Sequence, residues 1–339
     1  MRPAGIPRLS SRLRPASRLR PPSRLRPASR LRLPSRLRPA SRLRPASRLR
    51  PASRLRLLLV LAGAAVLAAC SGPQAPNHPA SMAPQATYYL ALGDSLSQGV
   101  QPDAAGVSVE TTDGYPDQVY AALHPTHPGL ELVKLGCPGE TTSTMMDGGK
   151  CHYQSGSQLA AAAAFLQAHR GRVLLVTLDI GANDPEVCGG EPGLTQLAKC
   201  AVTGIPDAVV HLGAIMNRLT AAAPGVRIVG MNYYLPALAE WHNGLPGQVV
   251  ARTAEKLAVV YNQALDQVYT RSGARVANVF GAFQTSDYSR PNGDAPRNGT
   301  LLCQWSWACA DPPRGPNQHA NQAGYQVIAR TFLQASGLS

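Results

Sequence analysis

Short apolar runs alternate with longer amphipathic stretches through the C-terminal three quarters of the chain. The strand candidates are 87–93, 131–135, 173–180, 226–232 and 275–280. The helix candidates lie near 114–123, 157–169, 206–222 and 249–271, with a last one at 320–336. Strands that alternate with helices predict a single α/β domain over 87–339, with a parallel sheet covered on both faces. Ligands of such sheets bind at the carboxyl ends of the strands.

The first 56 residues follow a different pattern. The unit Ser-Arg-Leu-Arg recurs every six residues, at Ser11, Ser17, Ser23, Ser29, Ser35, Ser41, Ser47 and Ser53. A segment so poor in large apolar residues cannot bury enough surface to offset its chain entropy, which predicts disorder. It could act as a basic arm that binds nucleic acid or anionic lipid. We favour a repeat upstream of the true translation start, because an export signal follows it.

Charge separates this repeat from the rest of the chain. Residues 1–56 hold 18 of the 33 Lys and Arg and no Asp or Glu, so the remainder has 15 against 19 Asp and Glu, a formal net charge of −4. The basic balance therefore belongs to the repeat. The folded part has no Gly-rich phosphate loop, metal cluster or nucleic-acid motif. We expect no cofactor, no metal and no nucleic-acid partner, and a monomer.

An apolar run of 13 residues, 57–69, follows two arginines and ends at Cys70. The run is too short for a comfortable membrane span but fits the apolar region of a signal peptide. Leu67-Ala68-Ala69-Cys70 resembles the bacterial lipobox, in which the cysteine is lipidated; an ordinary signal peptide is the alternative. Residues 71–86 are typical of a flexible linker. We therefore expect export, with Cys70 anchoring the protein at the outer face of a bacterial membrane, or secretion.

Six cysteines remain beyond Cys70, and an even number in an exported chain suggests disulfides. Six cysteines allow 15 pairings, and neighbours in sequence would pair as Cys137–Cys151, Cys188–Cys200 and Cys303–Cys309. A zinc site is the alternative, but no Cys-x-x-Cys or His-x-x-x-His spacing supports it.

The first predicted strand runs directly into Gly93-Asp94-Ser95-Leu96. This places Ser95 on a tight turn between the strand and a following helix, with its hydroxyl facing the cleft. Gly93 permits the turn, and Asp94 can accept hydrogen bonds from nearby backbone. Four residues recur by chance, and a turn serine or helix cap is the simpler interpretation of this motif alone.

Three further segments follow later in the chain. They are Gly136-Cys137-Pro138-Gly139-Glu140 after the second strand, Gly181-Ala182-Asn183-Asp184 after the third, and Asn317-Gln318-His319 before the last helix. These four segments, in this order over 88–335, resemble the four sequence blocks of the SGNH (GDSL-type) hydrolase family. The resemblance implies a three-layer, doubly wound, flavodoxin-like, mostly parallel five-stranded sheet. Cys-Pro-Gly-Glu-Thr-Thr and a Trp-x-Trp-x-Cys segment before His319 are similar to a secreted, disulfide-containing bacterial branch.

The resemblance also implies the roles of the residues in these blocks. Ser95 is the nucleophile, and His319 is the base that activates it. The backbone N–H groups of Ser95 and Gly139, with the side-chain amide of Asn183, form the oxyanion hole. The aspartate that usually precedes the histidine is absent, so His319 could be oriented by Asn317, by Asp311 or by a backbone carbonyl.

Together these features predict a serine esterase or lipase that hydrolyses carboxylic esters. Its substrate would be a small-molecule, lipid or acylated-glycan ester, and the sequence does not separate a fatty acyl chain from a small acetyl group. The alternative is a non-catalytic envelope protein that binds glycan or lipid through the same cleft, which the missing aspartate suggests.

Overall fold

The computed structural model describes residues 87–184, 203–291, 293 and 295–338. The predictions for the repeat at 1–56, the segment 57–70 with Cys70, the linker 71–86 and the pair Cys188–Cys200 lie outside the described residues.

Five strands form the central sheet: β1 (Thr87–Gly93), β4 (Leu130–Lys134), β5 (Val173–Asp179), β6 (Ile228–Met231) and β7 (Arg275–Ala277). Their order is β4-β1-β5-β6-β7, and every neighbouring pair is parallel. Since the second of these strands lies on one side of the first and the other three lie on the opposite side, the sheet is doubly wound and flavodoxin-like, as predicted. The winding direction changes between β1 and β5.

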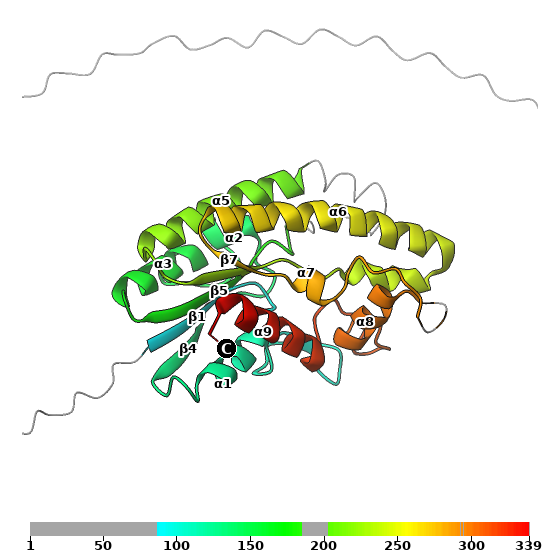
Figure 1. Cartoon of the computed structure of the whole chain (residues 1–339), viewed down its shortest axis with the longest axis horizontal. Coiled ribbons are helices and arrows are strands. Elements are labelled where there is room, and N and C mark those ends of the chain that lie inside the picture. Colours follow the sequence, from blue (N-terminus) through cyan, green and yellow to red (C-terminus); the bar gives the residue numbers. More distant parts are fainter. Residues whose placement is uncertain (1–86, 185–202, 292, 294, 339) are drawn as a thin grey trace, which may run out of the picture. The chain divides into compact units, whose positions relative to one another are not determined.

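Helices cover both faces of the sheet (Figure 1). On one face, α1 (Tyr115–Leu123) packs against α9 (Gln322–Ser336). On the other face lie α3 (Gln158–Ala168), α5 (Gly204–Ala222) and α6 (Gly244–Arg271), with α2 (Thr142–Asp147) against α5. Among the described helices, none combines the length and the apolar character that a membrane crossing needs.

The local sequence explains where the helices begin and end. The Ser157 side chain accepts the Ala160 N–H at 3.2 Å and caps α3. The Asn321 side chain accepts the Gly324 N–H at 3.0 Å and caps α9, which ends at Gly337 in the left-handed conformation. These caps satisfy backbone groups that the helices leave unpaired. Strands β1 and β5 are fully buried over their last five residues, because helices cover both faces.

Some predicted boundaries were wrong. Helix α6 begins five residues before the predicted 249, because Pro246 lies in its first turn, where a missing N–H costs no helical bond. Strand β7 ends at Ala277 instead of 280, because the Asn278 side chain accepts the Gly281 N–H and starts a short helix. Several short elements carry no clear periodicity and were not predicted: α2, the 3₁₀ helix η2 (Pro236–His242), α7 (Val279–Ala282) and α8 (Arg297–Trp305).

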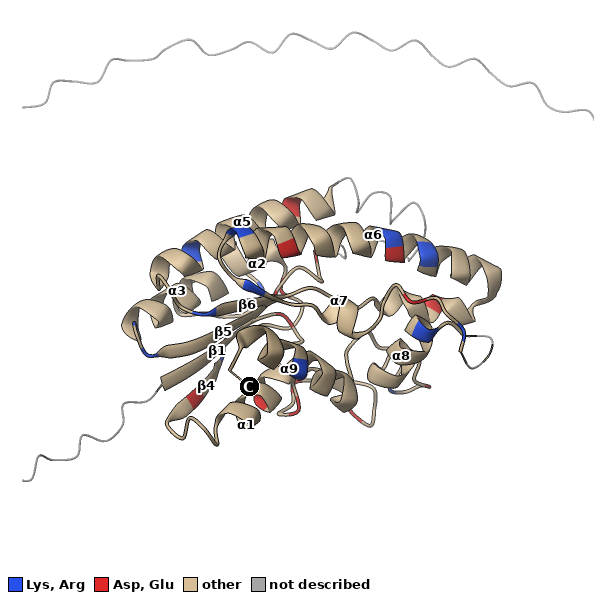
Figure 2. Cartoon of the chain, in the orientation of Figure 1, with Lys and Arg blue, Asp and Glu red and all other residues tan. Residues whose placement is uncertain are grey.

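Charged residues of both signs are interspersed over α5, α6 and the connecting loops (Figure 2). This mixed distribution agrees with the small negative net charge of the chain outside the repeat.

Close packing between β6 and α6 gives a test of the fold. A Cβ added to Gly230 would lie 2.2 Å from the ring of Tyr269, which is fully buried. We expect Gly230→Ala to lower the free energy of unfolding by roughly 1–3 kcal/mol, because the ring must move within a packed core. In the control Gly213→Ala, the added Cβ has no atom within 4 Å, and stability should stay equal or rise by up to about 1 kcal/mol. Urea unfolding followed by circular dichroism measures both; equal losses would contradict the packing.

Candidate active site

Ser95 lies on the turn that ends β1, at the carboxyl edge of the sheet, and is 8% exposed. Gly93 has φ of 138°, and a Cβ there would lie 2.1 Å from the Asp179 carbonyl oxygen, so only glycine fits. The Asp94 carboxylate accepts the Leu96 N–H at 3.0 Å. The turn is thus held by its own side chains, and the role expected for Gly93 and Asp94 matches the observed bonds.

The expected helix after Ser95 is not present. Residues 95–99 form consecutive turns, in which the Ser95 carbonyl accepts the Gln98 and Val100 N–H groups. A two-stranded hairpin of β2 (Gln101–Pro102) and β3 (Ser108–Val109) then precedes α1. Ser108 of this hairpin contacts Asn317 next to His319.

His319 stands opposite Ser95. Its Nε2 lies 2.9 Å from Ser95 Oγ, and its Nδ1 lies 2.7 Å from Asn317 Oδ1. Asn317 Oδ1 also accepts the His319 backbone N–H at 3.0 Å. A backbone N–H can only donate, so the oxygen of the amide must face the histidine. The proton of the imidazole is therefore on Nδ1, and the Nε2 lone pair is directed at the serine hydroxyl.

Asn317, one of the three orienting groups considered from the sequence, is thus the one next to the imidazole, whereas Asp311 is exposed. Asn317 Nδ2 donates to Ser108 Oγ on the hairpin at 3.1 Å. No periodicity in the sequence pointed to Ser108. Its only signal was its position in a polar loop after the Gly-Asp-Ser turn.

The loop that carries His319 is fixed on two sides. The Trp307 N–H donates to the His319 carbonyl and the Asn317 N–H donates to the Trp307 carbonyl, both at 3.0 Å. The Tyr234 hydroxyl donates to the Gln318 carbonyl at 2.8 Å. The disulfide Cys303–Cys309 closes the turn that contains Trp307. These bonds hold the imidazole without contribution from a carboxylate.

Burial lowers the pKa of His319 to about 4, because the surrounding protein disfavours the charged imidazolium. Among the described residues, the partner of the ring is the neutral Asn317 amide, and burial is the one cause of the shift. The imidazole is therefore neutral across the physiological range and able to accept a proton.

The three expected oxyanion donors line one cavity with His319. This cavity has a volume of about 300 Å³, and its walls include Ser95, Gly139, Asn183 and His319. Asn183 Nδ2 donates one hydrogen bond to the Glu140 carbonyl at 2.8 Å and carries a second N–H, and the residue lies in the cavity wall.

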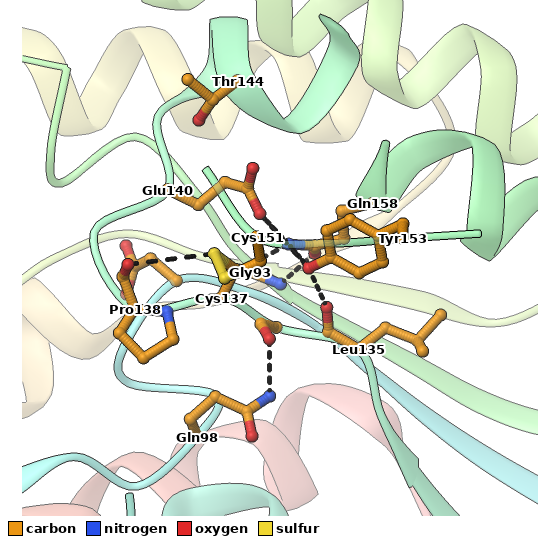
Figure 3. Close-up of a disulfide and its surroundings, with 12 residues drawn as sticks. Gly93, Gln98, Leu135, Cys137, Pro138, Glu140, Thr144, Cys151, Tyr153 and Gln158 are labelled. Carbon is orange, nitrogen blue, oxygen red and sulfur yellow. Dashed lines mark hydrogen bonds between the residues drawn. A yellow bond between two sulfur atoms is a disulfide. The ribbon is translucent and has the colours of Figure 1, made fainter. Parts of the chain in front are cut away.

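A disulfide and a buried carboxylate hold the loop around Gly139. Cys137–Cys151 joins this loop to the segment before α3 (Figure 3). Asp184 accepts the Thr142 N–H at 2.9 Å and also the Thr142 hydroxyl, so the loops after β4 and β5 are tied together. Burial raises the pKa of the Asp184 carboxyl, while these hydrogen bonds act in the opposite direction. Two of the three expected disulfide pairs are thus present among the described residues.

A second cavity, of about 220 Å³, adjoins Ser95 and His319 on the side of β6 and α6. Its walls are mostly apolar and include Tyr233, Leu235, Pro236, Ala258 and Tyr261. This pocket could not be predicted from the sequence, since its residues come from five separate segments.

In the described part of the chain, one group could surround a metal ion: His242, Cys303 and Cys309. The two cysteines are joined in a disulfide, which removes the thiolates that metals bind. The group therefore does not fit a metal centre in this state.

The doubly wound sheet, with a serine and a neutral histidine paired at its switch point, has the architecture of a hydrolase. More particularly, residues 91–327 match the model of the GDSL-like Lipase/Acylhydrolase family, and the chain belongs to this family. No curated protein gives a significant match to the sequence.

Among solved structures, the chain is similar to an extracellular lipase of Streptomyces rimosus, with 21% identity and a TM-score of 0.51 over 74% of this chain and 100% of that one. Phospholipase A1 of Streptomyces albidoflavus is 18% identical, with a TM-score of 0.48 over 74% of this chain and 99% of that one. The likeness to the Streptomyces rimosus lipase supports the fold alone.

The Asn317–His319 pair makes a pH-dependent prediction. Asn317→Asp would place a full negative charge at Nδ1, which favours imidazolium and raises the pKa of His319. The Ser108 hydroxyl can reverse its bond and donate to the new carboxylate. The acidic limb of kcat/KM should therefore move to higher pH, together with the His319 resonance in an NMR titration. Asn217→Asp, on an exposed position of α5, should move neither; identical limbs in all three proteins would contradict this electrostatic account.

Proposed function

We propose that this protein is a serine esterase that hydrolyses carboxylic esters through an acyl-enzyme on Ser95. The observation that carries the proposal is the 2.9 Å contact between Ser95 Oγ and His319 Nε2, beside a cavity that Gly139 and Asn183 also line. A serine hydroxyl is a weak nucleophile until a base takes its proton. His319 is neutral, and its proton is on Nδ1, so Nε2 is able to accept the hydroxyl proton.

In the first half of the reaction, Ser95 Oγ attacks the ester carbonyl carbon while His319 Nε2 takes the hydroxyl proton. The tetrahedral oxyanion accepts hydrogen bonds from the backbone N–H groups of Ser95 and Gly139 and from the Asn183 amide. The C–O bond of the ester then breaks, and His319 returns the proton to the leaving alcohol. In the second half, water attacks the acyl carbon while His319 Nε2 takes one of its protons. The bond between the acyl carbon and Ser95 Oγ then breaks, His319 returns the proton to Ser95 Oγ, and the carboxylic acid leaves.

The two cavities beside Ser95 suit the two parts of an ester, the acyl chain and the alcohol. The apolar cavity near Ala258 suits an acyl chain longer than acetyl, because burying methylene groups there is favourable. The cavity with Ser108 and Glu110 is more polar and suits the alcohol part. A lipid or other acyl ester therefore fits the site better than an acetylated glycan.

The setting of this enzyme is the second part of the proposal. The disulfides Cys137–Cys151 and Cys303–Cys309 are suited to an oxidising compartment. They support export and the secreted, disulfide-containing branch of the family. Cys70 as a lipid anchor, and a monomer acting on membrane or envelope esters, are proposed from the sequence alone.

Removing the nucleophile tests the esterase. Ser95→Ala should lower kcat for p-nitrophenyl esters by at least roughly 10³-fold, because no other group can form the acyl-enzyme. Wild type should prefer medium-length acyl chains over acetyl. The control Ser155→Ala, at an exposed position, should keep full activity. Equal turnover by wild type and Ser95→Ala would reject the assignment and favour a non-catalytic binding protein.

Lipid attachment is tested separately at Cys70. Metabolic labelling with a fatty-acid probe in a bacterial host should mark wild type and not Cys70→Ala, because the thiol is the attachment point in the lipobox motif. Labelling that persists in Cys70→Ala would refute a lipid at this cysteine, with no bearing on the esterase.

A further inference from the structure

Two side chains interrupt the parallel ladder at the base of the Ser95 turn. In an unbroken ladder between β1 and the chain after β4, the Gly93 N–H would donate to the Leu135 carbonyl. Instead it donates to Gln158 Oε1 at 2.7 Å, and the Leu135 carbonyl accepts the Tyr153 hydroxyl at 2.7 Å. Figure 3 shows both side chains converging on the end of the strand. The Cys137 N–H still donates to the Gly93 carbonyl at 3.0 Å, so the strand end below the nucleophile is held by one backbone bond and by side chains from another segment.

Gln158 is completely buried, and both its amide oxygen and its amide nitrogen are hydrogen-bonded. Its Nε2 donates to the Gly93 carbonyl at 2.9 Å and to Glu140 Oε2 at 2.7 Å. Oε1 accepts the Gly93 N–H, and Nε2 also lies 3.3 Å from the Tyr153 hydroxyl, so both ends of the amide are engaged. Gln158 therefore acts toward Gly93 as a neighbouring strand would, while its second N–H reaches a different loop.

That loop is the one that carries Gly139. Glu140 is the next residue, and its side chain is completely buried. Its carboxylate binds Gln158, and its backbone carbonyl accepts the Asn183 amide at 2.8 Å. A continuous chain of hydrogen bonds thus runs from Gly93 through Gln158 and Glu140 to Asn183. It joins the turn of the nucleophile to both loops of the oxyanion hole.

We propose that Gln158 and Glu140 form a positioning clamp that sets the distance between Ser95 and the oxyanion donors Gly139 and Asn183. The proposal rests on the proposed esterase function, because it concerns the same site. Neither residue of the clamp touches the reacting atoms.

The Glu140 side chain and the Gly93 backbone together determine which way the Gln158 amide faces. Burying a carboxylate is costly even when it is hydrogen-bonded, and an apolar pair would fill the same space. A carboxylate, however, can only accept, so Glu140 requires the nitrogen of the Gln158 amide on its side. This leaves Gln158 Oε1 for the Gly93 N–H. Glu140 and the two backbone groups of Gly93 thus require the same orientation of the Gln158 amide.

A change of one functional group tests the clamp. Gln158→Glu places a second acceptor opposite the Glu140 carboxylate and the Gly93 carbonyl, so the loops should move apart. We expect kcat for a p-nitrophenyl ester at pH 8 to fall by roughly 10–100-fold, with KM changed by less than about threefold, because misplaced groups lose transition-state stabilisation. Glu140→Gln alone should cost less than about tenfold, since an amide oxygen can still accept from Gln158.

The double variant Gln158→Glu/Glu140→Gln restores a donor opposite the new carboxylate. It should recover kcat at least about fivefold above Gln158→Glu alone, as expected for residues in direct contact. The matched control is Gln167→Glu, the same change at an exposed position of the same helix, and it should keep wild-type kcat.

Active serines are counted in each full-length variant with a serine-directed phosphonate, so that kcat refers to folded, reactive sites only. Reduced kcat per titrated serine in Gln158→Glu, with recovery in the double variant, supports the clamp. Wild-type kcat per titrated serine in Gln158→Glu, or a double variant no better than the single one, overturns it. Failure of the esterase function is distinguishable, because wild type itself would then show neither hydrolysis nor phosphonate labelling.

Discussion

The hydrogen bond between Ser95 Oγ and His319 Nε2 joins residues 224 positions apart in the chain, and most of the polar structure around the site keeps it in place. Ser95 depends on the turn at the end of β1, where Gly93 adopts a conformation that a side chain would prevent. His319 depends on the Trp307 backbone, the Tyr234 hydroxyl and a disulfide. The two groups meet because β1 lies at the switch point of the sheet and the last loop before α9 passes over it.

The neutral partner of His319 changes the electrostatics of the pair more than its geometry. Asn317 fixes the tautomer as well as a carboxylate would, because its oxygen also accepts the His319 backbone N–H. It adds no negative charge, so burial dominates and the pKa of His319 lies near 4. In the proposed reaction, an imidazolium at His319 would be stabilised less than in a triad with aspartate. The lowered pKa also means that the His319 imidazole stays unprotonated, and able to act as a base, in mildly acidic surroundings.

Buried polar groups are concentrated below the site. Asp184 joins the loops after β4 and β5 through Thr142, and Glu140 joins the same loops through Asn183 and Gln158. Such networks hold a rigid arrangement only when their members find partners. The apolar core around the sheet supplies stability. These hydrogen bonds position the loops that follow β4 and β5 at the carboxyl edge of the sheet.

The alternation of strand and helix patterns determined the fold class, because burial on both faces produces continuous apolar runs that are visible in the sequence. Four short segments pointed to Ser95, Gly139, Asn183 and His319, and folding brings these residues to one cavity. The Ser108 contact, the role of Asn317 and the Gln158–Glu140 pair were decided only by the tertiary structure. Each of these depends on polar atoms brought together from distant segments, and a single polar side chain leaves no periodic signal in the sequence. The apolar cavity was hidden for the same reason, since its walls come from separate elements that only folding places side by side.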